Sequence, residues 1–427
     1  MIKICLVIFI YLKQFYFIMA LKKRKKPELM APAGNHESLV SAINAGADAV
    51  YLGVNEFNMR ITAKNFSLEE LHDVVLYAHK RNVKIYLTVN TIVFEDEIAK
   101  VKNVIKEAKK AGVDAIICWD MSVLSECKKQ NIDAFLSTQA SASNSYACEF
   151  YRKAGAKRIT LARECTLEQI KQIKQIKKKT KAELEIFIHG AMCVSISGRC
   201  FLSQDIFGKS ANRGDCLQPC RREYTITDNE EGHSYVLGSN YVLSPRDLCT
   251  MPFIEKILDS GVDSLKIEGR GRSAEYVSEV VSAYRKAIDL WYENKLDEKN
   301  KKILTKKLNS VYNRGFHSGF FLGKPSNQWS KCYGSKSTHI KEFVGIVKNF
   351  YAKPMAAEII IQSGKIEKGD TIIIIGPTTG TLKHKITSIQ INNVSVKSAN
   401  KGTSVGIKLK KTARKNDKVY TWKPRKD

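Results

Sequence analysis

Three scarcities in the sequence narrow the class of protein. Acidic side chains are few, with 43 Asp and Glu against 70 Lys and Arg, so the formal net charge is +27. A membrane-spanning helix needs about 20 consecutive, predominantly apolar residues, and the apolar residues 4–20 are interrupted by Lys13 and Gln14. The helical zinc-protease motif His-Glu-x-x-His is absent. A membrane-spanning protein and a metalloprotease of that type are therefore disfavoured.

The surplus of positive charge indicates a partner of opposite sign. A soluble enzyme that acts on small molecules rarely needs a net charge of +27, whereas a nucleic acid is a polyanion that such a surface attracts. A general lysine bias of the proteome is the alternative explanation. The hydrophobic fraction of 44% supplies enough apolar side chains for a folded core, which excludes a mainly disordered chain.

The first residues combine the apolar stretch with a basic run, Lys22–Lys26. A signal peptide would carry its positive charge mainly before the apolar stretch and would end in a small-residue cleavage site. A weak anchor, a signal and an upstream extension from a misassigned start codon are the three interpretations. We favour an extension over residues 1–26, with Met19 as the working start, and a cytoplasmic protein with no membrane partner.

From Pro27 to Asn294 the pattern alternates between short β-rich apolar runs and helical segments. Eight runs and at least seven helices follow one another, and linkers such as Ala45–Asp48 place a glycine between a helix and the next strand. This rhythm predicts an α/β fold, a (β/α)8 TIM-like barrel. A doubly wound open sheet would need a glycine-rich phosphate loop after its first strand, and Ala31–Asn35 is not one.

Three further segments complete the predicted organisation. Residues 190–252 interrupt the alternation between the seventh and eighth strands, and a barrel would place this insertion at its active-site face. Residues 295–342 form a helical and irregular connector. Residues 343–427 read as short strands of a small β-barrel, and residues 381–427 carry thirteen Lys and Arg against two Asp. This domain resembles the second, β-barrel domain of translation elongation factors, which lies against RNA.

Four of the eleven cysteines fall within 28 residues of the insertion: Cys193, Cys200, Cys216 and Cys220. Thiolates are soft ligands that select zinc or iron–sulfur clusters. The spacing lacks the two close pairs of a zinc ribbon and suits a [4Fe–4S] cluster. Arginines between the cysteines would stabilise thiolates. Cys249 is a fifth candidate ligand, and ordinary free or buried cysteines are the alternative.

Several motifs in and around the insertion resemble those of the peptidase U32 family. They are His189-Gly-Ala-Met-Cys193, Ser197-Gly-Arg-Cys200, Asn212-Arg-Gly-Asp-Cys216-Leu-Gln-Pro-Cys220 and Ser264-Leu-Lys-Ile-Glu-Gly-Arg270. The resemblance runs from about Pro27 to Trp291, and the motifs together are highly specific. The family is named for collagenase-like proteases, and its better-understood branches are hydroxylases that carry a [4Fe–4S] cluster.

The branch that the chain resembles most forms 5-hydroxyuridine at the wobble position of tRNA and depends on prephenate. The resemblance implies that Cys193, Cys200, Cys216 and Cys220 hold the [4Fe–4S] cluster, with prephenate as co-substrate and tRNA as partner. Other branches act on ribosomal RNA cytidine or on ubiquinone precursors. A U32-type peptidase is the runner-up, with Cys193 and His189 as its thiol and base. A non-catalytic RNA-binding protein is a third interpretation, and an accessory U32 paralogue or a second copy of the chain is a further candidate partner.

Charged residues at the predicted carboxyl ends of the strands are candidates for catalysis, because such residues are rarely buried unless paired or functional. Glu268 is a candidate to move protons. Arg60, Arg163 and Arg270 form a set that would suit the two carboxylates of prephenate. The alternative is a group of salt bridges that closes the barrel.

Uncharged groups at the same ends complete the candidate site. His189 opens the insertion and is a candidate proton donor, cluster ligand or neighbour of the cluster, with a histidine bonded to the backbone as the alternative. Gln139 and Asn90 are amides suited to reading a base edge or holding a substrate carbonyl. Polar filling of the barrel mouth is the alternative for these two residues.

Overall fold

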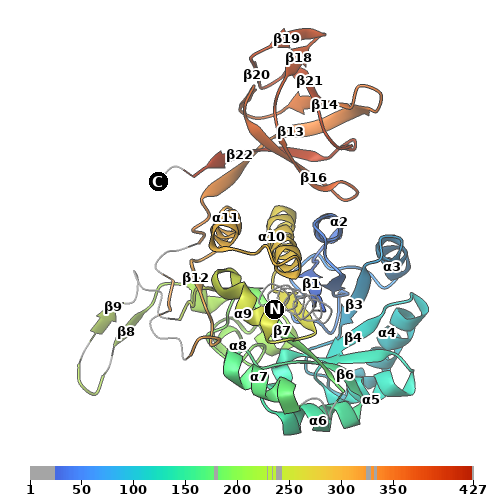
Figure 1. Ribbon diagram of the computed structural model, residues 1–427, viewed down its shortest axis with the longest axis vertical. Coiled ribbons are helices and arrows are strands. Elements are labelled where there is room, and N and C mark those ends of the chain that lie inside the picture. Colours follow the sequence, from blue (N-terminus) through green and yellow to red (C-terminus); the bar gives the residue numbers. More distant parts are fainter. Residues whose placement is uncertain are drawn as a thin grey trace, which may run out of the picture.

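A parallel barrel of eight strands forms the body of the protein (Figure 1). The computed structural model describes residues 25–176, 181–227, 229–232, 234–236, 243–323, 328–330 and 334–425. Seven strands pair in chain order, and the eighth closes the ring by pairing in parallel with the first and the seventh. The predicted (β/α)8 fold is confirmed. The strands are β1 (Glu28–Pro32), β2 (Ala49–Leu52), β3 (Lys84–Thr88), β4 (Ala115–Cys118), β5 (Asp133–Leu136), β6 (Ala156–Thr160), β7 (Glu183–Gly190) and β11 (Ser264–Ile267).

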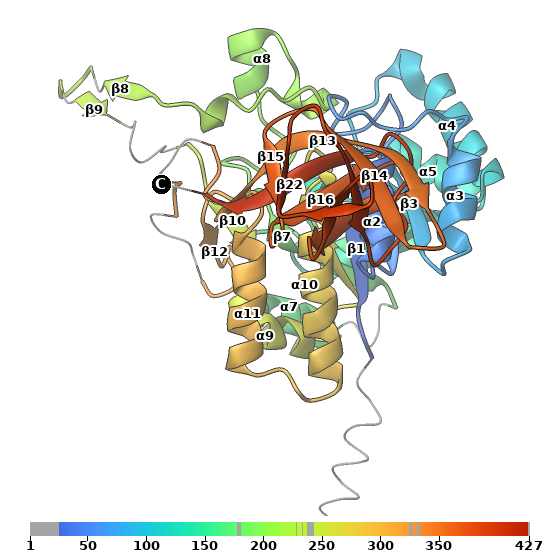
Figure 2. The same ribbon diagram turned by 90° about the horizontal axis from the view of Figure 1, so that it is seen from above.

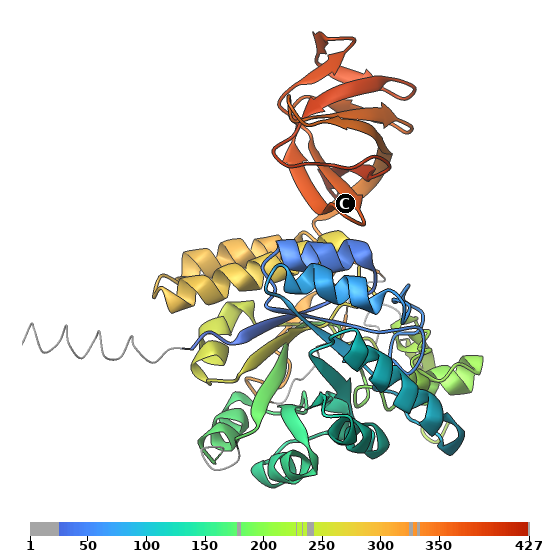
Figure 3. The same cartoon turned by 90° about the vertical axis from the view of Figure 1, so that its right-hand side faces the viewer.

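Helices cover the outside of the barrel, which Figure 3 shows from the side. Local signals set their ends: Asn35 and Asn144 accept backbone N–H groups in the first turns of two of them. Gly112 and Gly155 follow two helices with φ values of 83° and 121°, a conformation that favours glycine. The helices are α2 (His36–Asn44), α3 (Leu71–His79), α4 (Ile98–Lys110), α5 (Met121–Lys129), α6 (Ser145–Ala154), α7 (Leu167–Ile176), α9 (Ile254–Asp259), α10 (Ala274–Tyr292) and α11 (Glu298–Asn309).

The inside of the barrel is filled by aromatic and charged side chains. Tyr86 and Phe135 pack edge to face with ring centroids 4.8 Å apart. Beside them, Arg158 Nη1 lies 2.5 Å from Glu28 Oε1 and 3.5 Å from Glu185 Oε2. Arg158 and Glu185 have side chains 5% and 1% exposed, so the ion pairs are desolvated and losing one partner would leave an uncompensated charge.

The cysteine-bearing insertion leaves the barrel where β7 ends. It contains α8 (Leu202–Phe207) and a hairpin of β8 (Thr225–Thr227) and β9 (Ser234–Val236), which project from one end of the barrel in Figure 2. Strand β10 (Asp247–Cys249) then returns and pairs antiparallel with β7, and β12 (Phe316–His317) extends the sheet beside it. The insertion therefore begins and ends at the carboxyl end of β7.

An antiparallel β domain follows the barrel and confirms the predicted C-terminal β fold. Its eight-stranded sheet has the order β17-β16-β22-β13-β14-β21-β18-β19, and β15 pairs with β20 in a second, small sheet. A separate apolar core fills the domain. The strands are β13 (His339–Tyr351), β14 (Ala356–Ile361), β15 (Lys365–Glu367), β16 (Thr371–Gly376), β17 (Gly380–Lys385), β18 (Ile389–Ile391), β19 (Val394–Val396), β20 (Ser398–Asn400), β21 (Ser404–Lys408) and β22 (Lys418–Pro424).

The β domain rests on the side of the barrel, against α2 and α10 (Figure 1). Ser41 of α2 lies 2.9 Å from Thr381 of β17 between hydroxyl oxygens. Lys383 lies 3.4 Å from Glu279 of α10, and Trp422 joins the main barrel core. The domain is thus attached to the helical wall, away from the carboxyl ends of the strands.

The predicted extension over residues 1–26 lies outside the described residues except for its last two. Lys26 Nζ lies 2.9 Å from Asp289 Oδ1, which ties this point of the chain to α10. Among the helices that the structure describes, none combines the length and the apolar composition that crossing a membrane requires.

Candidate active site

An ion pair and a backbone contact gather part of the predicted site at the carboxyl ends of β7 and β11. Arg60 Nη2 lies 3.4 Å from Glu268 Oε1, although 208 residues separate them in the chain. The backbone N–H of Ala191 donates to Glu268 Oε2 at 3.3 Å. Arg163 donates to the carbonyl oxygen of Ala191 at 2.7 Å, so the Arg163 side chain and Glu268 hold the same short turn after β7.

Glu268 is held in its ionised form. Burial of this carboxyl raises its pKa, but Arg60, Arg272 and Arg163 lower it by more, so its pKa lies below the ordinary value. The side chain is 11% exposed. An ionised carboxylate in this place can accept a proton or fix a guanidinium, and it has no proton to donate near neutral pH.

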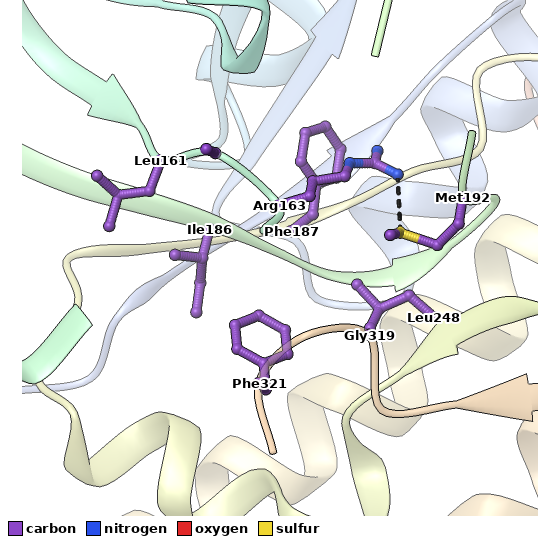
Figure 4. Close-up of a pocket in the computed structure, with 9 residues that line it drawn as sticks. Leu161, Arg163, Ile186, Phe187, Met192, Leu248, Gly319 and Phe321 are labelled. Atoms are coloured by element: carbon purple, nitrogen blue, oxygen red, sulfur yellow. Dashed lines mark hydrogen bonds between the residues drawn. The ribbon is translucent and has the colours of Figure 1, made fainter. Parts of the chain in front are cut away.

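Arg163 lies in the barrel mouth with part of its guanidinium unused. Its guanidinium carbon lies 4.0 Å from the centre of the Phe187 ring, and Nη1 lies 3.3 Å from Met192 Sδ. Figure 4 shows this side chain at the edge of a cavity of about 10 Å³ that Leu248 and Phe321 also line. Arg163 Nε has no hydrogen-bond partner among the described residues. Burial lowers the pKa of Arg163, so a bound anion would relieve a desolvated cation.

Arg270 has a different position from that expected of a residue that grips substrate. Its Nη1 donates to Thr88 Oγ1 at 2.9 Å, and its Nη2 donates to Asn58 Oδ1 and Asn65 Oδ1, each at 2.6 Å. The side chain is buried, and burial lowers its pKa to about 10. Both terminal nitrogens of Arg270 are therefore committed, Nη1 to the end of β3 and Nη2 to the loop that carries Arg60.

Gln139 and Asn90 bond to each other. Asn90 Nδ2 donates to Gln139 Oε1 at 3.2 Å, and Gln139 Nε2 donates to the Asn90 carbonyl oxygen at 2.7 Å. The Ser137 hydroxyl also donates to Gln139 Oε1 at 2.6 Å. Asn90 Oδ1 accepts the backbone N–H of Met59 at 3.2 Å. The amide pair thus joins the ends of β3 and β5 to the Arg60 loop.

His189 is buried behind this mouth, with 1% of its surface exposed. Its Nδ1 lies 3.3 Å from the Tyr284 hydroxyl, and its ring packs against Tyr284 and Phe316 at centroid distances of 5.5 and 5.4 Å. Burial lowers the pKa of His189 to about 4, although Asp247 and Glu268 oppose this shift. The imidazole is therefore neutral near pH 7 and is not a proton donor in its charged form.

Three of the four clustered cysteines lie within one electrostatic neighbourhood. Burial raises the pKa of Cys220, Arg221 lowers it, and the thiols of Cys193 and Cys216 raise it further. Cys193 and Cys216 also raise the pKa of Arg60. The chemistry of this donor set, thiols among guanidinium groups, suits an anionic thiolate-bound cluster.

The four cysteines are less closely arranged than ligands of a bound cluster would be. Cys193 is exposed, and the other three are partly buried. The backbone N–H of Cys200 donates to Asn212 Oδ1 at 2.9 Å, which fixes its loop. No group of three His, Cys, Asp or Glu side chains in the described part of the chain is gathered closely enough to hold a metal ion. The four thiols would have to draw together around a cluster.

Cys249 belongs to the core instead. It is 2% exposed, its Sγ lies 3.9 Å from the Tyr284 hydroxyl, and burial raises its pKa to about 11. None of the groups that shift the Cys249 pKa is another cysteine. We therefore assign Cys249 to packing and keep Cys220 in the candidate ligand set.

The sequence did not predict the contacts of three further residues of the site. Arg221 Nη2 donates to the Met192 carbonyl oxygen at 2.6 Å and fastens the insertion to the mouth. Arg314 forms a buried pair with Asp247 at 2.6 Å. At Gly214, with φ at 93°, a Cβ atom would come within 2.1 Å of the Asn58 carbonyl oxygen. The Asn-Arg-Gly-Asp motif was a usable signal, because this glycine permits the insertion to lie directly on the Arg60 loop.

The sequence pattern of Peptidase family U32 matches residues 34–331, which include the insertion and all of the barrel except β1. The chain belongs to this family. Three U32 relatives differ in their names. An uncharacterized protease of Methanocaldococcus jannaschii is 42% identical over 93% of this chain and 98% of that protein. A collagenase of Porphyromonas gingivalis is 38% identical over 94% of this chain and 99% of that protein. The tRNA hydroxylation protein P1 of Bacillus subtilis is 36% identical over 86% of this chain and 87% of that protein.

Proposed function

We propose that this U32 protein is an iron–sulfur-dependent RNA hydroxylase that acts on the wobble uridine of tRNA with prephenate as co-substrate. The observation that carries the proposal is the crowding of guanidinium groups around one carboxylate and the cysteine loop. Arg60, Arg163 and Arg272 all lower the pKa of Glu268. Cys193 also raises the pKa of Arg60, so the two groups lie close enough to interact electrostatically. Cations exceed anions at the mouth, which suits an anionic co-substrate, an anionic cluster and RNA.

Each group would have a defined part. Cys193, Cys200, Cys216 and Cys220 would hold the [4Fe–4S] cluster, which supplies electron transfer or substrate activation when bound. Arg60 and Arg163 would bind the two carboxylates of prephenate, because Arg60 is partly exposed and Arg163 has a free Nε. Glu268 would orient Arg60 and accept a proton. The Asn90–Gln139 pair would face the uracil edge, and Arg270 and His189 would keep the surrounding loops in place.

A U32-type peptidase is the competing proposal, because two of the relatives are named protease and collagenase. A thiol protease needs a base that activates its thiol. The groups that act on His189 are Asp247, Glu268 and Arg272, with no cysteine among them in the described residues. The sequence has one Gly-x-Ser-x-Gly match, Gly402–Gly406, but it lies along β21, and its Ser404 hydroxyl donates to Glu358.

Nucleoside analysis of tRNA tests the hydroxylase directly. Digested tRNA from cells that lack the gene is compared by mass spectrometry with tRNA from cells complemented by the intact gene or by Arg60→Gln. We expect 5-hydroxyuridine and its derivatives to disappear in the deletion and to return only with the intact gene. An unchanged level of 5-hydroxyuridine in tRNA from the deletion, in a cell with no second U32 gene, would overturn the proposal. A ribosomal RNA cytidine that lost its hydroxyl instead would redirect the proposal to that branch.

A further inference from the structure

A basic hollow of about 780 Å³ opens on the C-terminal β domain, far from the barrel mouth in sequence. It lies where β15 and β17 end and β20 begins. Three exposed lysines, Lys368, Lys385 and Lys397, stand around it. The hydroxyl side chains of Thr387 and Ser398 line it as well. We call this feature the lysine hollow.

The three lysines of the hollow lack acidic partners. No carboxylate lies within 4.0 Å of their Nζ atoms in the described part of the chain. Some other lysines of the domain are paired, with Lys348 2.9 Å from Glu358 and Lys423 3.0 Å from Glu342. The one acid that lines the hollow, Glu367, is itself bound by Lys365 at 2.7 Å. The hollow therefore gathers three unneutralised positive charges around one depression of the basic domain.

The backbone beneath the lysines is firmly held. The N–H of Lys368 donates to the Lys397 carbonyl oxygen at 2.9 Å, and the N–H of Gly369 donates to the Ile386 carbonyl oxygen at 2.9 Å. Ile366 and Ile386, each 1% exposed, pack below these segments. The three lysines therefore project from one rigid base, and only their side chains are free to follow a ligand.

We propose that the lysine hollow binds the sugar–phosphate backbone of the RNA substrate at a point distant from the base that reacts. This inference rests on the proposed function, because that function supplies an RNA. Positive charge with hydroxyl groups matches a chain of phosphates and riboses. The hollow is too wide for a single phosphate ion, and its three unpaired lysines favour a polyanion over an uncharged peptide.

The placement of the domain fits such a second contact. The β domain stands on α2 and α10 (Figure 1), while the insertion with α8 projects from the end of the barrel in Figure 2. β20 lies on the left flank of the domain in Figure 1 and β15 on its left flank in Figure 2, and the β8–β9 hairpin projects to the left in each view. A long polyanion can reach both the hollow and the barrel mouth, and a small substrate cannot.

Binding of an unmodified tRNA transcript to the full-length protein tests the hollow. Fluorescence anisotropy is measured at several salt concentrations for wild type and for Lys368→Gln/Lys385→Gln/Lys397→Gln. The matched control is Lys353→Gln/Lys415→Gln/Lys418→Gln, which removes three exposed and unpaired lysines from the same domain. We expect the hollow variant to bind at least tenfold more weakly. We also expect the slope of log K against log salt to fall by about 2 to 3, the value for three lost phosphate contacts.

The control triple variant should bind within about threefold of wild type, and equal melting temperatures would show that all three proteins fold. A hollow variant that binds like the control would overturn the inference. Failure of the proposed function gives a different result. If wild type binds tRNA through the hollow but forms no hydroxyuridine, the proposed hydroxylase function is wrong and RNA binding at the lysine hollow is supported. If hydroxyuridine forms and the KM for tRNA is equal in the two triple variants, RNA binding at the lysine hollow is wrong and the hydroxylase proposal is unaffected.

Discussion

The Arg270 guanidinium donates through Nη2 to Asn65 Oδ1 at 2.6 Å, across 205 residues of sequence. The bond joins the end of β11 to the loop after β2, which are brought together because β11 closes the barrel beside β1. The partners of Arg270 are neutral oxygens, and no carboxylate pairs with it among the described residues. A buried cation of this kind is stabilised only while every partner stays in place. We infer that it positions Arg60 and does not bind substrate.

Replacing Arg270 should therefore destabilise the whole barrel. We expect Arg270→Lys to lower the free energy of unfolding by about 2 to 4 kcal/mol, because a single ammonium cannot serve Thr88, Asn58 and Asn65 together. Urea unfolding followed by circular dichroism measures the loss. Asn65→Ala should give a smaller loss of the same sign. A change below about 0.5 kcal/mol in Arg270→Lys, the range of ordinary surface substitutions, would contradict this positioning role.

The Arg60–Glu268 pair should control the affinity for prephenate. Arg60→Gln removes one charge-assisted hydrogen bond to a carboxylate, so we expect the KM for prephenate to rise roughly 10- to 100-fold. Glu268→Gln should leave Arg60 unoriented and lower kcat as well, because the carboxylate that accepts a proton is lost. Steady-state kinetics with fixed tRNA separates the two effects. The control is Arg152→Gln, at an exposed pair with Glu149 on α6. A KM for prephenate equal to that of this control would rule out Arg60 as a ligand.

Burial of His189 gives the fold a defined sensitivity to acid. Its pKa is about 4 in the folded protein against an ordinary value of 6.5, so the unfolded chain takes up the proton first. The contribution of the neutral His189 imidazole to the free energy of unfolding is complete above pH 6.5 and is lost as the pH falls toward 4. Between pH 7 and pH 5 we expect wild type to lose about 2 kcal/mol more unfolding free energy than His189→Gln.

Chemical denaturation at the two pH values measures that difference. Asp247, Glu268, Arg272 and Tyr284 face the imidazole and remain present in both proteins. His36→Gln on the surface of α2 serves as the control, because its side chain is 43% exposed. If wild type and His189→Gln lost the same stability on acidification, the buried neutral imidazole would not be the cause.

Iron content should separate the clustered cysteines from Cys249. Protein purified without oxygen should contain about four iron and four acid-labile sulfide atoms per chain, the composition of a [4Fe–4S] cluster. We expect Cys216→Ala and Cys220→Ala to lose them together with the visible absorption. Cys249→Ala should keep both, because its thiol lies in the core beside Tyr284. Wild type without iron, zinc or sulfide would overturn the cluster and return the thiol-protease proposal to first place.

Much of the scaffold was predictable because its signals are local. Several βα units carry their own apolar strand, helix cap and terminal glycine, such as Asn144 and Gly155 around α6. The cysteine insertion was equally visible, since its four thiols lie within 28 residues. The sequence by itself thus determined the barrel, the basic β domain and the place of the insertion.

Only the tertiary structure decided which polar residues serve the site. Arg60 and Arg270 look alike in sequence, yet one is partly exposed beside Glu268 and the other is buried among amide and hydroxyl oxygens. Cys249 was a fifth candidate that could replace Cys220 until its burial beside Tyr284 separated the two. These distinctions depend on contacts across 35 to 212 residues. No local pattern encodes them, because they arise only when β11 closes the ring and the insertion folds back over the strand ends.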